Sequence, residues 1–106
     1  MKEMLQEDTI IKLGKTAREN WDLLDTNENF IWMHLNSYPS GHVIIECDNP
    51  SNGMLHMCAL HCKDNTKYRN LKNVKVCYTT VGNLIKGDKV GSVIYKSKRK
   101  VKYIVV

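Results

Sequence analysis

The chain has 106 residues, 42% of them hydrophobic and 25% charged. This composition fits one globular domain spanning 1–106 better than a disordered chain. No apolar run is long enough to span a bilayer, and the N-terminus lacks the apolar segment of a secretory signal, so we expect a cytoplasmic protein with reduced cysteines and no membrane partner. The formal net charge of +5 favours a polyanionic partner, although a solvated lysine-rich surface is an equal alternative.

The first predicted elements are a strand and a short helix. Thr9–Leu13 is a β-branched and apolar run, which is typical of a strand. Thr16 and Glu19 have the spacing of a capping box, in which the hydroxyl accepts from the Glu19 N–H and the carboxylate reaches back. A short helix should follow and end at the polar cluster Asp25–Asn29.

Two strands are predicted next, at Phe30–Leu35 and His42–Cys47, and we expect them to pair antiparallel. Side chains alternate between the faces of a strand, so the first of these strands has an aliphatic face and an aromatic face with a polar end. The aliphatic face carries Ile31, Met33 and Leu35, and the aromatic face carries Phe30, Trp32 and His34.

The second half predicts one helix and three strands. Met54–Lys63 carries an apolar stripe at helical spacing. Val74–Thr79, Val90–Tyr95 and Val101–Val106 are predicted strands, the last two joined as a hairpin by a basic turn at Lys96–Lys100. The pattern predicts an α+β fold, a mostly antiparallel sheet with one or two helices packed on one face.

Histidine and cysteine offer candidates for catalysis or metal binding. His34 and His42 have the chemistry of an acid–base pair for RNA cleavage, but no third catalytic group accompanies them, and histidines at strand ends are commonly structural. Cys58 and Cys62 fall on the apolar helical stripe, beside His61, without the pair spacing of structural zinc sites. We therefore expect no metal and no cofactor.

Gly14-Lys15-Thr16 has the last residues of a phosphate-binding P-loop, but Thr9 stands where the first glycine belongs, so nucleotide hydrolysis has no support. A weaker interpretation places Lys15 and Arg18 at a helix N-terminus, whose free N–H groups attract phosphate. A plain strand–helix turn is the equal alternative.

Basic residues concentrate in the second half. Residues 1–53 hold four Lys or Arg and nine Asp or Glu, a net charge of −5, whereas residues 54–106 hold twelve and two, a net charge of +10. Such clusters bind nucleic-acid backbones with release of counterions, and an aromatic ring beside them can stack on unpaired bases. The cations form two sets: Lys63, Lys67, Arg69, Lys72 and Lys75, and Lys96, Lys98, Arg99, Lys100 and Lys102.

Five short motifs occur in a fixed order along the chain. They are GKTARENWDLL (14–24), IWMH (31–34), PSGHVII (39–45), VKVCYTTVGNLIK (74–86) and GSVIY (91–95). In this order they resemble the NFACT-R domain, which is regarded as the RNA-binding module at the end of the NFACT proteins of ribosome-associated quality control. Pro-Ser-Gly replaces the family's Pro-Gly-Ser, and the coiled-coil tail and other NFACT domains are not in this sequence.

The resemblance implies nucleic-acid binding, chiefly to RNA, with tRNA or ribosomal RNA and the large ribosomal subunit as partners and DNA as an open alternative. It does not decide between a non-catalytic RNA-binding module, a protein-interaction module that docks on the ribosome or another partner, and a histidine-dependent ribonuclease. We expect the first of these, and no enzyme. With the basic turn, the matched positions give these candidate nucleic-acid contacts: Lys15, Arg18, Asn20, Trp32, His34, His42, Lys86, Lys96, Lys98, Arg99 and Lys100.

Overall fold

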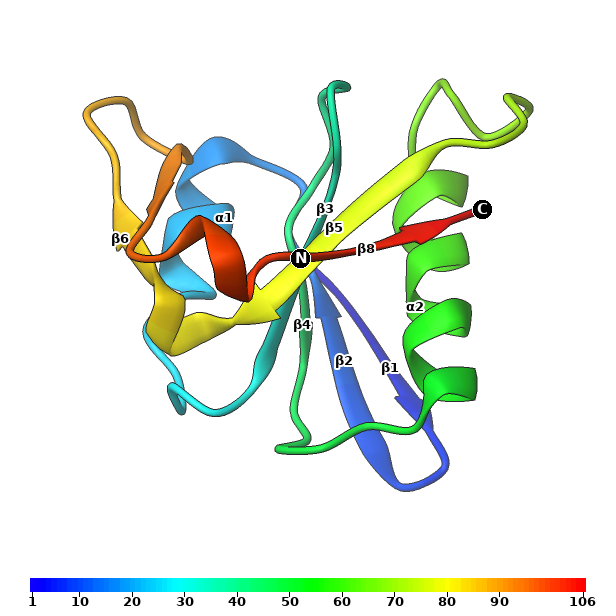
Figure 1. The fold of residues 1–106 in the computed structure, drawn as a ribbon, viewed down its shortest axis with the longest axis horizontal. Coiled ribbons are helices and arrows are strands. Elements are labelled where there is room, and N and C mark those ends of the chain that lie inside the picture. Colours follow the sequence, from blue (N-terminus) through cyan, green and yellow to red (C-terminus); the bar gives the residue numbers. More distant parts are fainter.

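A computed structural model describes residues 1–106 as eight strands, two α-helices and two 3-10 turns (Figure 1). In chain order these are β1 (Lys2–Gln6), β2 (Thr9–Leu13), α1 (Ala17–Asp22), β3 (Ile31–Leu35), β4 (Val43–Ile45), α2 (Asn52–Asp64), β5 (Lys75–Thr80), η1 (Val81–Asn83), β6 (Leu84–Lys86), β7 (Val93–Tyr95), η2 (Lys98–Lys100) and β8 (Lys102–Val105).

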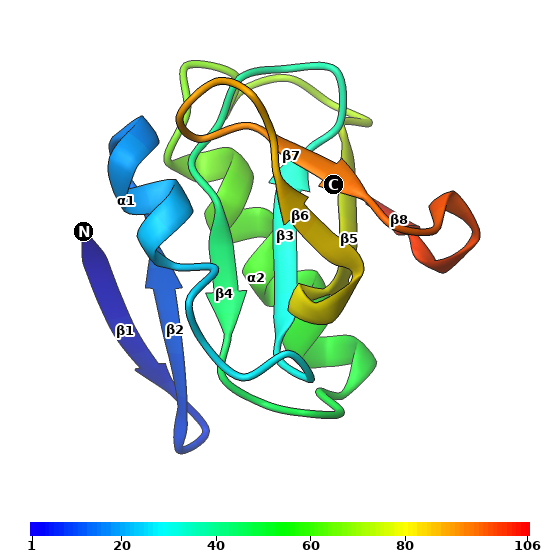
Figure 2. The same ribbon diagram turned by 90° about the vertical axis from the view of Figure 1, so that its left-hand side faces the viewer.

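Six strands form one antiparallel sheet in the order β1-β2-β4-β3-β5-β8, and β6 and β7 form a separate antiparallel pair. Helix α2 covers one face of the large sheet, while α1 and the β6–β7 pair lie on the opposite side (Figures 1 and 2). The predicted α+β class, with a mostly antiparallel sheet and a helix packed on one face, is confirmed. Neither α-helix is both long and apolar enough to cross a membrane.

The core between α2 and the sheet is aliphatic. Ile31, Met33 and Leu35 of β3 face α2, as the alternation predicts, and Met33 has no exposed surface. The stripe of α2 packs against them, including Cys58 and Cys62, which are both buried. Burial raises the pKa of both thiols to about 12, so these cysteines remain protonated and pack as small apolar side chains.

A second, smaller core lies on the other face of the sheet. Trp32 of β3 is its centre, and only 1% of its surface is exposed. The covering layer supplies Leu23 from the end of α1, Leu84 from β6 and Val101 from the segment before β8. The sheet is therefore buried on both faces, and its two central strands carry apolar side chains on both sides.

The predicted strands at 9–13, 30–35, 42–47 and 74–79 and the helix at 54–63 are confirmed to within two residues at each end. Strands β1 and β6 were not predicted. In β1 most side chains are exposed, so it lacks the alternation of a half-buried strand, and β6 has only three residues.

The predicted hairpin around Lys96–Lys100 is wrong. β7 pairs with β6 rather than with β8, and β8 pairs with β5 in the large sheet. The basic segment therefore connects two sheets. Asn83 anchors it, because its buried amide donates to Ser97 O and Thr79 Oγ1 and accepts from the Ser97 N–H, at 2.9, 3.0 and 2.9 Å.

Both helices begin with a side-chain cap. The Thr16 hydroxyl accepts from the Glu19 N–H at 3.1 Å, as the capping box predicts, and the Glu19 carboxylate reaches back to the Lys15 N–H at 2.9 Å. The start of α2 was predicted two residues late. Its cap is Ser51, whose hydroxyl accepts from the Met54 N–H at 3.1 Å.

We expect Ser51→Ala to lower the free energy of unfolding by about 1 kcal/mol, because the first turn of α2 loses the acceptor for one N–H. Urea denaturation followed by circular dichroism measures this change. Ser97→Ala is the matched control, since Ser97 precedes η2 without a side-chain cap bond. Equal losses in the two variants would contradict the assignment of the cap.

Candidate functional site

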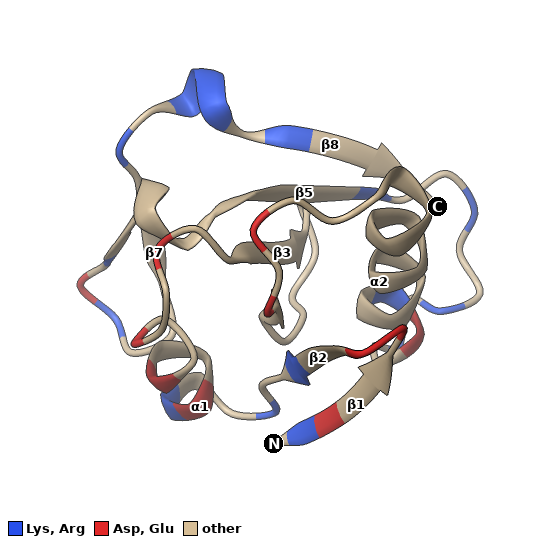
Figure 3. Ribbon diagram, turned by 90° about the horizontal axis from the view of Figure 1, so that it is seen from below, with Lys and Arg blue, Asp and Glu red and all other residues tan.

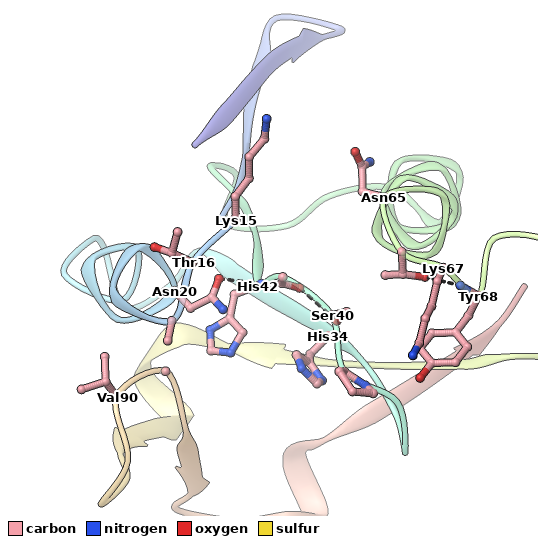
Figure 4. Close-up of a pocket in the computed structure, with 15 residues that line it drawn as sticks. Lys15, Thr16, Asn20, His34, Ser40, His42, Asn65, Lys67, Tyr68 and Val90 are labelled. Atoms are coloured by element: carbon pink, nitrogen blue, oxygen red, sulfur yellow. Dashed lines mark hydrogen bonds between the residues drawn. The ribbon is translucent and has the colours of Figure 1, made fainter.

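An open groove of about 640 Å³ lies at the end of the sheet where β3 finishes and β4 begins (Figure 4). Four segments that are distant in the sequence form its walls. They are the start of α1, the β3–β4 loop, the loop after α2 and the tip of the β6–β7 loop, represented in Figure 4 by Lys15, His42, Lys67 and Val90.

His34 and His42 lie side by side at the floor of the groove. Their ring centroids are 5.4 Å apart and the rings are nearly perpendicular. Both project from the same face of the sheet as Trp32, whose ring lies parallel to His34 at 5.9 Å and edge-on to His42 at 5.3 Å. The aromatic face predicted for β3 therefore extends into the floor of the groove.

Ser40 holds the β3–β4 loop in shape. Its hydroxyl accepts from the Leu35 N–H at 3.1 Å and donates to the Gly41 carbonyl at 3.0 Å. His42 comes two residues after Ser40 and leads directly into β4. Ser40 thus has a structural function at the position where the sequence departs from the NFACT-R pattern.

Asn20 is a positioning residue between α1 and β4. Its Oδ1 accepts from the backbone N–H of His42 at 3.0 Å, and the backbone N–H of Gly14 donates to the His42 carbonyl at 2.9 Å. A Cβ atom on Gly14 would collide with Asn20 Oδ1, and one on Gly41 would collide with the Gly14 carbonyl. Both glycines are required because the two segments approach so closely.

Both histidines are neutral at pH 7. Burial lowers the pKa of His34, and burial together with the neighbouring His34 lowers the pKa of His42 to about 4. The Nδ1 of His34 lies 2.6 Å from the carbonyl of Leu35, so Nδ1 carries the proton and Nε2 is left as an acceptor. His42 Nδ1 has no hydrogen-bond partner.

The rim of the groove is basic. Of the fifteen lining residues, Lys15 and Lys67 are cationic and none is acidic, and neither lysine belongs to a salt bridge. Both side chains are exposed, and Lys67 Nζ lies 5.5 Å from the centre of the Tyr68 ring. This groove can accept a negatively charged group without first breaking an ion pair.

The N-terminus of α1 is partly occupied by its own capping box. The N–H groups of Lys15 and Glu19 are already bonded within the capping box, and the Glu19 carboxylate adds a negative charge there. The interpretation of this turn as a phosphate-binding helix N-terminus stays a prediction, which the capping box makes less favourable. Lys15 is itself a lining residue of the groove.

Trp32 and Lys63 are both buried. His34, His42 and Tyr95 pack around the ring of Trp32, a residue of which 1% is exposed, so this ring is not available for stacking on a base. Lys63, which was counted with the basic surface, is also buried, and its Nζ donates to the Leu71 carbonyl at 2.9 Å.

Arg18 and Lys86 lie outside the groove, and each is paired. Arg18 Nε lies 3.4 Å from Asp22 Oδ1 on the exposed side of α1. Lys86 Nζ lies 3.1 Å from Asp25 Oδ1 and 5.8 Å from the Trp21 ring. Their charges are partly neutralised by these carboxylates.

The cations around η2 form a second basic region (Figure 3). The segment leads into β8 at one edge of the sheet, whereas Lys15 follows β2, and three strands lie between β2 and β8. With about 4.8 Å between neighbouring strands, β2 and β8 are roughly 19 Å apart across the sheet. The candidate residues therefore divide between two surfaces, and this one holds Lys96, Lys98, Arg99 and Lys100.

No protein-family model matches the chain, and no curated protein matches it. A solved structure does match, "The structure of the C-terminal of the fibronectin/fibrinogen-binding protein from Streptococcus suis (FBPS)", with a TM-score of 0.87 and 27% sequence identity over 98% of this chain. This chain has the fold of that C-terminal region. It spans 44% of the solved chain, which is less than half.

We expect the stability of the protein to fall as the pH drops from about 6.5 to about 4. In this range the unfolded chain binds a proton at His42 that the folded chain does not, which costs about 3 kcal/mol once the pH is below both pKa values. His34 acts in the same direction. Urea unfolding at a series of pH values gives the slope.

His42→Gln keeps a polar side chain of similar length but cannot be protonated, so its stability should depend less steeply on pH over the same range. An unchanged slope in this variant would show that His42 is not the source of the pH dependence.

Proposed function

We propose that the protein is a non-catalytic RNA-binding module of the NFACT-R type. The observation that carries this proposal is the groove with two unpaired lysines on its rim and no carboxylate in its lining. RNA carries one negative charge per nucleotide, and binding at lysines releases counterions from it. The sequence resemblance supports the same function, with tRNA or ribosomal RNA as the ligand and the cytoplasm as the location.

The ligand reaches the protein at two basic regions in this proposal. Lys15 and Lys67 hold phosphates at the groove, and the residues around η2 provide a second contact for a longer RNA. Arg18 and Lys86 contribute less, because each must first leave a carboxylate partner.

The protonation state of the histidines supports a binding function rather than RNA cleavage. An acid–base pair needs one imidazole protonated and one neutral at the working pH. With its pKa lowered to about 4, His42 is rarely protonated at pH 7, and the pKa of His34 is lowered as well. Two neutral imidazoles can form hydrogen bonds with a ligand without transferring a proton to it.

A protein ligand is the second candidate. The solved structure with this fold belongs to a protein whose name says that it binds fibronectin and fibrinogen, so a protein partner, on the ribosome or elsewhere, is a specific alternative. The two candidates differ in a simple test. The tagged chain is used to recover its partner proteins from an extract, which is then treated with nuclease. Partners that contact the chain directly remain bound, whereas partners that are held to it through RNA are released.

We expect Lys15→Ala/Lys67→Ala to weaken binding to single-stranded RNA and to reduce the slope of log K against log salt concentration by about 0.7 for each lysine. Fluorescence anisotropy with a labelled oligonucleotide over a salt series measures both quantities. Lys2→Ala/Lys72→Ala is the matched control, since it removes the same charge from exposed lysines outside the groove.

Two results would contradict the proposal. One is an unmodified protein that does not bind RNA at low salt. The other is an equal loss of affinity in both double variants, which would mean that net charge acts without the groove.

A further inference from the structure

A smaller cavity of about 250 Å³ adjoins the groove on the side of the β6–β7 pair. It shares His34, His42 and Gly91 with the groove, and its remaining walls are Trp32, Ser92, Val93 and Tyr95. None of these residues carries a formal charge at pH 7, so the cavity differs from the basic rim above it.

Two polar atoms in the lining residues of this cavity are buried without a partner. They are Trp32 Nε1 and His42 Nδ1, and these two residues are 1% and 3% exposed. A buried polar group without a hydrogen bond costs about 1–3 kcal/mol, so such groups are rare unless water or a ligand satisfies them. His34 Nε2 adds an acceptor at the boundary with the groove.

The chemistry of the cavity favours a neutral, planar and polar group. No lysine or arginine lines it, and its imidazoles are neutral, so a phosphate or carboxylate would lose its hydration without gaining an opposite charge. Aromatic rings form several walls, and the available atoms include an indole donor, an imidazole acceptor and a second imidazole that serves as either. The edge of a nucleobase presents donors and acceptors of this kind, and its ring is flat.

We propose that this cavity receives one unpaired nucleobase of the bound RNA, with Trp32 Nε1–H, His34 and His42 hydrogen-bonded to its polar edge. This inference rests on the proposed function and adds to it a site that distinguishes a base from the sugar–phosphate backbone. The backbone lies in the groove near Lys15 and Lys67, while one base turns through the wall that His34, His42 and Gly91 share. Trp32 and His42 are shielded from water, so this wall shifts as the base enters.

The test compares three RNA hexamers with the same number of phosphates: hexauridylate, hexaadenylate and a hexamer of abasic nucleotides. The readout is the indole N–H resonance of Trp32 in ¹⁵N–¹H spectra, and Trp21→Phe identifies which of the two indole signals belongs to Trp32. At least one base-containing hexamer should shift this signal and bind about tenfold more tightly than the abasic hexamer.

His34→Ala should reduce the affinity for that base-containing hexamer to the level of the abasic one and leave the abasic affinity unchanged. His56→Ala is the matched control, since it removes an exposed histidine of α2 outside the groove. Circular dichroism confirms that both variants are folded.

If all three hexamers bind with equal affinity and the Trp32 signal does not move, the base site is wrong and the RNA-binding function stands. If no hexamer binds, the proposed function is wrong and the base site with it. If the abasic hexamer itself shifts the Trp32 signal as much as the others do, the cavity responds to the backbone and the assignment of a base is overturned.

Discussion

The alternation of side chains along β3 is the constraint on which the rest of the structure depends. Met33 and its aliphatic neighbours face α2, and Trp32 and His34 consequently face the β6–β7 side. A shift of one residue in register would place the indole under α2 and the aliphatic side chains in the groove. The position of the candidate site follows from this single choice of face.

The low pKa values of the two histidines are a consequence of the same arrangement. His34 continues the Trp32 face of β3, and His42 enters β4 beside it, so both imidazoles pack against the ring of Trp32 and are largely removed from water. Burial disfavours the charged form of each imidazole, and the neighbouring His34 disfavours the charged form of His42 further. The sheet therefore supplies neutral hydrogen-bonding groups, and the charges of the groove come from the loops.

Periodic patterns in the sequence predict the parts of the fold that are buried. The stripe of α2 and the two faces of β3 were predicted because burial selects apolar residues at regular spacing. Strand β1 was not predicted, since most of its side chains are exposed to solvent and an exposed edge strand needs no regular spacing of apolar residues. The basic segment after β7 is held by Asn83, a single buried amide that leaves no periodic signal in the sequence.

The candidate site could be predicted only in part, for a related reason. His34, His42, Asn20 and Lys15 do meet at one groove, but the loop after α2 brings Lys67 and Tyr68 to the same place, and no sequence spacing relates that loop to the others. The η2 cations were grouped with them by charge, and the strand order separates them. The total charge predicts how strongly the protein attracts a polyanion. The topology of the fold decides which of those charges can act on the same segment of the polyanion. For that reason, substitutions at the groove lysines and at η2 should have nearly additive effects on RNA affinity, because the groove and the hollow beside η2 share no lining residue.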